Sequence, residues 1–118
     1  MAATMAAAIR HFQPGEIIFL SGTSGDEAYL IRSGQVQIYD RLDGQDITHA
    51  HLKPGDIVGE MALVDGRRRS ASARATGPVD VVVIPRALFL HELERTPPII
   101  RRLVEAYVAV IRDRNHRR

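Results

Sequence analysis

The chain has 118 residues, the size of one ordinary domain; 45% of them are hydrophobic and 25% are charged. This balance supports one packed core and excludes wholesale disorder. Because the sequence has no cysteine, it excludes disulfide frameworks, thiol nucleophiles and Cys-ligated zinc. No apolar run approaches the roughly 20 residues of a membrane-spanning helix, and residues 1–8 lack the features of a secretory signal. We therefore expect a cytoplasmic protein with no membrane insertion.

Sixteen basic residues against 14 acidic ones leave a net charge of only +2. Fifteen of the basic residues are arginines, so those that matter have to be found individually. The basic run at residues 112–118 lacks the interleaved aromatic residues and the folded reading head that are typical of a nucleic-acid binder. We predict a frayed, soluble tail there and no direct nucleic acid binding.

Glycine and proline punctuate the first 80 residues, and short segments rich in Ile, Val, Tyr and Phe lie between these breaks. Their spacing of about 8–12 residues favours an all-β sandwich or barrel. The pattern Pro-Gly-acidic-Ile occurs at 14–17 and again at 54–57, which we interpret as reuse of one turn chemistry. The segments that we expect to be strands are 16–20, 28–32, 35–41, 47–52 and 79–84.

After Pro85 the apolar spacing changes to that of helices. Residues 86–95 form one helical pattern, and an amphipathic pattern begins at Ile99, after a pair of prolines. We expect a single domain over residues 1–118, with a β-roll over about 9–85 and hinge and lid helices over about 86–116. The apolar positions of the last helix are Ile100, Leu103, Val104, Tyr107 and Ile111.

Segment 59–73 carries the most chemical information. Gly59 has no Cβ, so the backbone can pass close to a ligand, and a short helix after it would present N–H groups to an anion. Arg69 can donate two hydrogen bonds to a phosphate, and Ser70 adds a hydroxyl donor. Glu60 suits a ligand that also has a hydroxyl to donate. Together these residues predict a site for a nucleotide, with a carboxylate for the ribose and an arginine for the phosphate.

In this segment the chain resembles the cyclic nucleotide-binding domain, the module of catabolite activator proteins, protein kinase A regulatory subunits and cyclic-nucleotide-gated channels. That family has a phosphate-binding cassette, a Gly-Glu-apolar-Ala-Leu run ending in Arg-Ser/Thr-Ala, and residues 59–63 and 69–71 match it position by position. Residues 12–19, 26–31 and 33–36 match as well, so the resemblance covers nearly the whole chain. It implies a mainly β fold with C-terminal α: an eight-stranded β-roll or jelly roll, a short cassette helix and two C-terminal helices.

The resemblance also implies how the ligand phosphate would be held. Arg69 would pair with the cyclic phosphate and Ser70 would assist it. Backbone N–H groups near Ala62 and Ala71 would contribute further hydrogen bonds.

Roles for the rest of the ligand follow in the same way. Glu60 would accept a hydrogen bond from the ribose 2′-hydroxyl, and Gly59 would allow close approach. The last helix would cover the base, with Tyr107 as the aromatic candidate and Arg112 as the polar one. The residues expected to line the pocket are Met61 and Leu63.

Each residue also has a purely structural interpretation. Arg69 alone would be one exposed member of the run 67–69, and Glu60 would be an acid stabilised by the helix dipole, but the cassette favours ligand binding for both. An aromatic residue such as Tyr107 on an amphipathic helix is more often part of a core. Ser72 is expected to face solvent.

His49 and His51 would share one face of a strand, a pattern that cupins use to hold a metal. Residues 52–55 stand where the cupin pattern needs an acid, and no suitable later histidine precedes His91. We therefore expect no metal and no cofactor apart from the nucleotide ligand. No nucleophile-base pair or carboxylate pair at a telling spacing suggests catalysis, so we expect no enzyme.

The expected function is that of a small receptor for cyclic nucleotides, with cAMP as first choice and cGMP as second, because Arg-Ser in the cassette occurs with cAMP in bacterial members of the family. Ligand phosphate would draw the cassette helix inward, the helix 86–95 would follow, and the helix 99–114 would close over the base. The apolar stripe of that last helix would then contact a second copy or an effector protein.

The chain departs from the family in two places. Only the Ala-rich start could supply the helix that precedes the roll in most members, and no winged helix-turn-helix follows the last helix. Two alternatives stay open: a regulatory fragment of a larger channel, transporter or transcription factor, and a β-roll interaction module that no longer binds a ligand.

Overall fold

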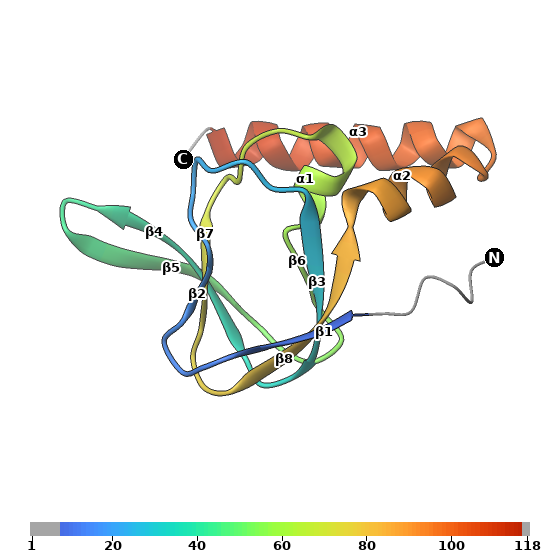
Figure 1. The fold of residues 1–118 in the computed structure, drawn as a ribbon. Helices are drawn as coiled ribbons and strands as arrows, with labels where there is room; N and C mark the ends of the chain where they lie inside the picture. The colour runs from blue at the N-terminus through green and yellow to red at the C-terminus, as the bar shows by residue number, and fades with distance from the viewer. Residues whose placement is uncertain (1–7, 117–118) are drawn as a thin grey trace.

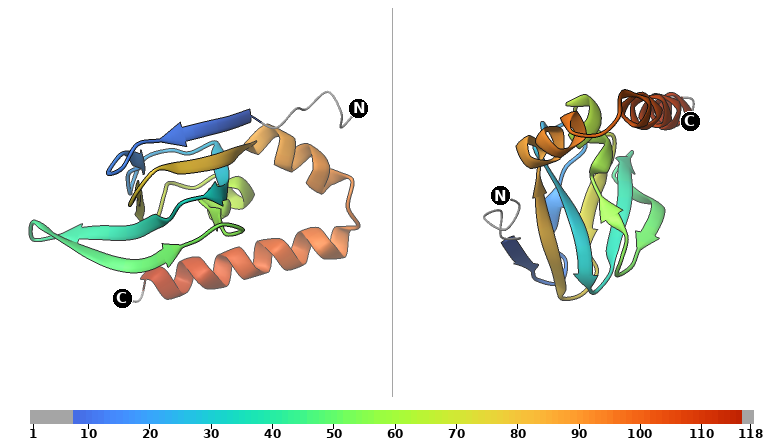
Figure 2. Two further views of the ribbon diagram at one scale, coloured as in Figure 1. Left: turned by 90° about the horizontal axis from the view of Figure 1, so that it is seen from below. Right: turned by 90° about the vertical axis from the view of Figure 1, so that its right-hand side faces the viewer.

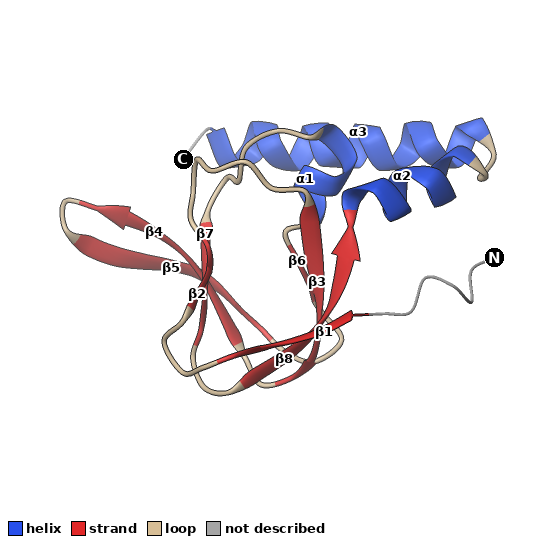
Figure 3. Cartoon of the chain, viewed as in Figure 1, coloured by secondary structure: helices blue, strands red, loops and turns tan. Residues whose placement is uncertain are grey.

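The computed structural model describes residues 8–116, with side chains up to residue 114. Eight strands, a short helix between the sixth and seventh strands and two C-terminal helices follow one another (Figures 1 and 3). This arrangement confirms the predicted fold class. The strands are β1 (Ala8–Phe12), β2 (Ile17–Phe19), β3 (Glu27–Ser33), β4 (Val36–Leu42), β5 (Gln45–Leu52), β6 (Ile57–Val58), β7 (Ser72–Ala75) and β8 (Val79–Pro85). The helices are α1 (Glu60–Asp65), α2 (Arg86–Glu94) and α3 (Pro98–His116).

The strands form two four-stranded antiparallel sheets, in the orders β1-β8-β3-β6 and β2-β7-β4-β5. Inward-facing residues of β3, β4, β6, β7 and β8, together with Phe12 of β1, make one apolar core. Strands β1, β6 and β7 lie outside the segments predicted above: β1 is exposed over four of its five residues, β6 has two residues and β7 has four. The largest fully buried side chains are Ile31, Val36, Val58, Val79 and Val81.

Two Pro-Gly turns, at residues 13–16 and 53–56, have the same construction. Gly15 and Gly55 have φ values of 82° and 96°, which a side chain would strain. In each turn the backbone N–H of the first residue donates to the carboxylate of the fourth, at 2.8 Å and 2.9 Å. The sequence echo therefore reflects one turn chemistry used twice, as interpreted above.

The three helices gather at one end of the β-roll (Figures 1 and 2). Helix α2 continues directly from β8, and α3 runs back across α1. Val108 and Arg112 lie one helical turn apart on the buried face of α3, and most of its other apolar side chains are exposed. No helix within residues 8–116 is long and apolar enough to span a membrane.

Two expectations from the sequence are wrong. Ser72 is buried, and its Oγ accepts a hydrogen bond of 2.9 Å from the backbone N–H of Ser21, so it joins β7 to the chain after β2. The C-terminal run does not begin to fray at residue 112, because α3 continues to His116. The Ala-rich start that was considered as an N-terminal helix falls in residues 1–7, outside the described part of the chain.

Candidate functional site

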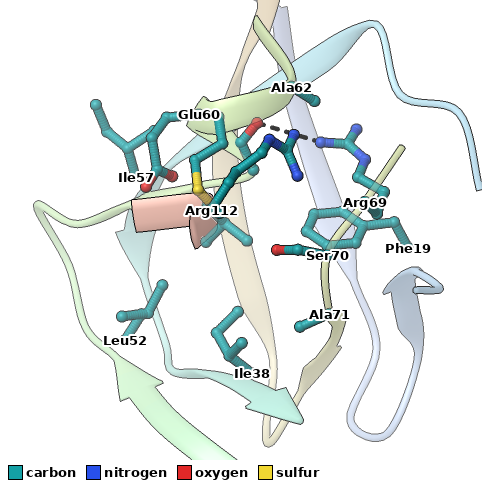
Figure 4. Close-up of a pocket in the computed structure, with 13 residues that line it drawn as sticks. Phe19, Ile38, Leu52, Ile57, Glu60, Ala62, Arg69, Ser70, Ala71 and Arg112 are labelled. Atoms are coloured by element: carbon teal, nitrogen blue, oxygen red, sulfur yellow. Dashed lines mark hydrogen bonds between the residues drawn. The ribbon is translucent and has the colours of Figure 1, made fainter. Parts of the chain in front are cut away.

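A cavity of about 230 Å³ opens between the β-roll and the helices. Apolar side chains from strands on both sheets make its wall, and α1, the segment after it and α3 make the polar end (Figure 4). The cavity is lined by Phe19, Ile38, Leu52, Ile57, Val58, Gly59, Glu60, Met61, Ala62, Arg69, Ser70, Ala71 and Arg112. The cassette predicted from the sequence thus surrounds this cavity.

Arg69 is one of two buried arginines that line the cavity, with only 6% of its surface exposed. Its Nη1 donates to the carbonyl oxygen of Gly59 at 3.2 Å, and its Nη2 donates to that of Glu27 at 2.8 Å. Its Nε is a buried nitrogen without a hydrogen-bond partner among the described residues. Burial lowers the pKa of the guanidinium from its ordinary value, although nearby acidic groups oppose the change. Arg69 therefore retains a donor beside the cavity that an anionic ligand can use.

Two glycines make the slot in which Arg69 lies. A Cβ on Gly25 would lie 2.1 Å from Cζ of Arg69, and a Cβ on Gly59 would lie 2.5 Å from its Nη1. Gly59 also has a φ of 82°, whereas Gly25 does not have a positive φ. Gly25 is therefore needed for space alone.

Helix α1 begins directly after Gly59 and ends at Asp65, and the next residue, Gly66, has a φ of 67°. Glu60, in its first turn, is exposed at the edge of the cavity. Ala62 is buried and lines the cavity, whereas Leu63 is buried but does not line it. The expectation that Leu63 lines the pocket is wrong, because the turn of the helix directs that residue into the protein instead.

Arg112 joins α3 to α1 across the mouth of the cavity. Its guanidinium forms a bidentate ion pair with the carboxylate of Asp65, in which Nη2 and Oδ1 are 3.0 Å apart, and its Nη1 donates to the carbonyl oxygen of Arg68 at 3.2 Å. Burial acts to raise the pKa of Asp65, but hydrogen bonds from Arg112 and from the backbone N–H of Arg67 outweigh it and lower the pKa. Arg112 is thus both a lining residue and a tether for the last helix.

The cyclic nucleotide-binding domain family matches residues 9–96, well over half of the chain. The chain belongs to this family. It is 34% identical to the cyclic AMP receptor protein of Thermus thermophilus over 88% of the chain and 49% of that protein. It is 36% identical to the cAMP-dependent protein kinase regulatory subunit of Emericella nidulans over 77% of the chain and 22% of that protein. The chain therefore spans about half, or less, of the curated relatives that it matches.

Solved structures show the same similarity. The cAMP-bound form of the EAL enzyme Bd1971 has a TM-score of 0.86 and 32% sequence identity, over 92% of this chain and 29% of that one. The cGMP-bound form of the same enzyme has a TM-score of 0.84 and also 32% identity, over 89% of this chain and 28% of that one. The comparisons of sequence and the comparisons of structure therefore identify the same family for this domain.

The structure separates the two residues that were considered for covering the base. Arg112 lines the cavity, but Tyr107 is 63% exposed and is not one of the lining residues. Val108 and Arg112 set the rotation of α3, and Tyr107 consequently lies on a different face of the helix. In this arrangement Tyr107 does not line the cavity that the cassette residues line.

Sequence reasoning missed the apolar wall that the strands contribute to the cavity. It also missed three residues around the two arginines: Phe19 beneath Arg69, Gly25 in its slot, and Asp65 as the partner of Arg112. Phe19 and Asp65 lie within or beside the matched motifs, but nothing local indicates their partners. His49, considered as a metal ligand, lies with its Nε2 2.6 Å from Oδ2 of Asp40 on the β4–β5 ladder. No cluster of three or more His, Asp or Glu side chains suited to a metal ion occurs within the described residues.

Proposed function

We propose that this domain binds a cyclic nucleotide, with cAMP preferred and cGMP second, and acts as a regulatory sensor without catalytic chemistry of its own. The observation that carries the proposal is Arg69: a buried guanidinium beside a cavity of suitable chemistry, with a donor atom left over. A desolvated arginine is a strong partner for a phosphate, because charge-assisted hydrogen bonds gain strength where water is excluded.

The other lining residues divide among the parts of such a ligand. Ser70 and the backbone around Ala62 and Ala71 would support the cyclic phosphate beside Arg69, and Glu60 would accept a hydrogen bond from the ribose 2′-hydroxyl. Gly59 would allow the sugar to approach. The apolar wall, which includes Met61, Ile38 and Leu52, suits the faces of a purine.

The preference for cAMP is supported by the Arg-Ser pair at 69–70 and by the names of the relatives, which include a cyclic AMP receptor protein. Arg112 would be the polar group nearest to the base. An arginine only donates hydrogen bonds, so it can meet acceptor atoms of either purine. This supports a graded preference in which cGMP also binds.

We propose that α3 acts as a lid. It is tied to α1 by the Asp65–Arg112 pair, and α1 carries Glu60, Met61 and Ala62, three of the residues assigned to the ligand. A ligand that binds better when α3 lies over α1 shifts the population toward that state, and each tenfold difference in affinity supplies about 1.4 kcal/mol. The helix α2 links this movement to β8.

A second copy of the domain is the partner that we propose for the outer face of α3. Ile100, Leu103, Tyr107 and Val110 are exposed there with spacings of three, four and three residues. That repeat is typical of helices that pair with each other. An effector protein at the same face, or a role as part of a larger regulator, is the alternative, since the relatives are longer than this chain.

Isothermal titration with cAMP, cGMP and linear 5′-AMP tests the proposed function. We expect micromolar or tighter binding of cAMP, weaker binding of cGMP, and little binding of 5′-AMP, whose additional negative charge and open phosphate do not fit a cyclic phosphate site. Absence of binding to both cyclic nucleotides would favour the interaction module instead.

A further inference from the structure

The guanidinium of Arg69 lies over an aromatic ring as well as between two glycines. Its Cζ is 4.2 Å from the ring centroid of Phe19, the last residue of β2 (Figure 4). Phe19 in turn stacks on Tyr29 of β3, with ring centroids 6.4 Å apart and planes inclined by 24°. Tyr29 belongs to the other sheet, so the ring of Phe19 is fixed between the two layers of the roll.

The ring is a second electrostatic partner for Arg69, besides the charges of the nearby Asp26 and Glu27. The hydrogen-bond acceptors that the described residues offer to Arg69 are backbone carbonyl oxygens, and its closest aromatic face is that of Phe19. The negative face of a ring attracts a cation, and the attraction grows when water is excluded. This contact therefore offsets part of the cost of burying the charge.

The ring and a ligand phosphate use different parts of the guanidinium. Stacking uses its flat face, whereas all five N–H groups lie in its plane and point outward from the edge. Phe19 can therefore hold the plane of Arg69 while an in-plane donor such as Nε stays free for an anion.

We propose that Phe19 is a positioning residue for Arg69, which orients and stabilises the buried guanidinium through a cation–π contact. The proposal rests on the proposed function for its effect on affinity, but not for its effect on stability. It assigns to an aromatic side chain, contributed by a strand 50 residues away in the sequence, part of the affinity for the anionic group of the ligand.

The first test is a cycle of thermal melts without any nucleotide, on wild type, Phe19→Leu, Arg69→Met and the double variant. Leu and Met keep an apolar side chain at each position and remove the ring face and the charge respectively. We expect the fall in Tm from Phe19→Leu to be clearly smaller in the Arg69→Met background than in the wild type. Equal falls in both backgrounds would overturn the proposal.

The second test compares cAMP affinities. Phe19→Leu should weaken binding roughly 3- to 30-fold, the range of a cation–π contact from exposed to desolvated. Phe19→Tyr, which keeps the ring face, should restore binding to within about threefold. Phe12→Leu is the matched control, because Phe12 lies in the same core and packs on Tyr29 at right angles, whereas Arg69 stacks over the ring of Phe19.

The outcomes separate the two proposals. A wild type that binds neither cyclic nucleotide refutes the proposed function, and the melting cycle still decides the role of Phe19. A wild type that binds cAMP while Phe19→Leu binds equally well refutes the role of Phe19. A loss of affinity shared equally by Phe19→Leu, Phe19→Tyr and Phe12→Leu would also refute it, because it would reflect core packing alone.

Discussion

Asp65, the last residue of α1, and Arg112, in the final turns of α3, form a bidentate ion pair across the mouth of the cavity. Both side chains are largely buried, at 22% and 9% exposure, so the pair is shielded from solvent. It connects the helix that carries the cassette with the helix that covers it.

Replacement of Asp65 by Asn should release α3 from α1. We expect a loss of about 1–3 kcal/mol in the free energy of unfolding, since a partly buried arginine loses its charged partner. Chemical denaturation measures this loss. Asp43→Asn is the control, because Asp43 is exposed in the β4–β5 hairpin and Asn tolerates its positive φ of 53°. Equal effects of the two changes would contradict a special role for the pair.

The same pair predicts a pH dependence. The pKa of Asp65 is lowered in the folded protein from its ordinary value of 3.8, so the unfolded chain binds the proton more readily. The stabilisation by the Asp65–Arg112 pair is therefore fully present at pH values above the ordinary pKa. It is lost as the pH falls through the lowered pKa of Asp65 in the folded protein. Thermal melts between pH 2 and pH 7 should show a steeper acid loss for wild type than for Asp65→Asn. Parallel curves would rule out this contribution.

Replacement of Arg69 by Ala should weaken cAMP binding by about 2–5 kcal/mol, because a desolvated phosphate loses its charged partner. Arg67→Ala is the matched control: Arg67 belongs to the same arginine run but is exposed. We expect its affinity to stay within about twofold of wild type by titration calorimetry. An Arg69→Ala variant that binds equally well would make the phosphate assignment wrong.

Replacement of Gly25 by Ala should displace the Arg69 guanidinium, since the new Cβ would lie 2.1 Å from its Cζ. We expect cAMP affinity to fall by roughly tenfold or more, about 1.4 kcal/mol. Gly77→Ala is the control, because a Cβ there meets nothing within 4 Å and its φ is not positive. Similar affinities for the two variants would show that the slot does not control Arg69.

Replacement of Glu60 by Ala tests the ribose assignment. We expect a loss of about 1–3 kcal/mol for cAMP, the range of a hydrogen bond to a charged acceptor. The sharper measurement uses 2′-deoxy-cAMP, which lacks the donor hydroxyl. Wild type should discriminate between the two ligands, and Glu60→Ala should bind them almost equally. A variant that still prefers cAMP as strongly as wild type would place the hydroxyl elsewhere.

Replacement of Leu103 by Glu tests the outer face of α3. If two copies pair there, a charge in the middle of the apolar repeat should convert a dimer to a monomer in analytical ultracentrifugation. Arg102→Glu changes an adjacent exposed residue and leaves the repeat intact, so it should keep the dimer. A wild-type domain that is monomeric at high concentration, with and without cAMP, would point to an effector protein instead.

The local features of this protein could be predicted from its amino-acid sequence. The Pro-Gly turns depend on glycine φ values and on a carboxylate three residues away, and the cassette from Gly59 to Ala71 is one short stretch of chain. These interactions join residues that are close together in the sequence, so composition, spacing and resemblance were enough to find them.

The contacts between residues far apart in the sequence became clear from the packing of strands and helices. Phe19 reaches Arg69 because β2 pairs with β7, and Asp65 meets Arg112, 47 residues later, because α3 folds back over α1. The same packing turned Tyr107 outward and Ser72 inward. These outcomes depend on strand pairing and on the rotation of a helix about its axis, and both are fixed by the sum of many weak contacts across the core rather than by any local pattern.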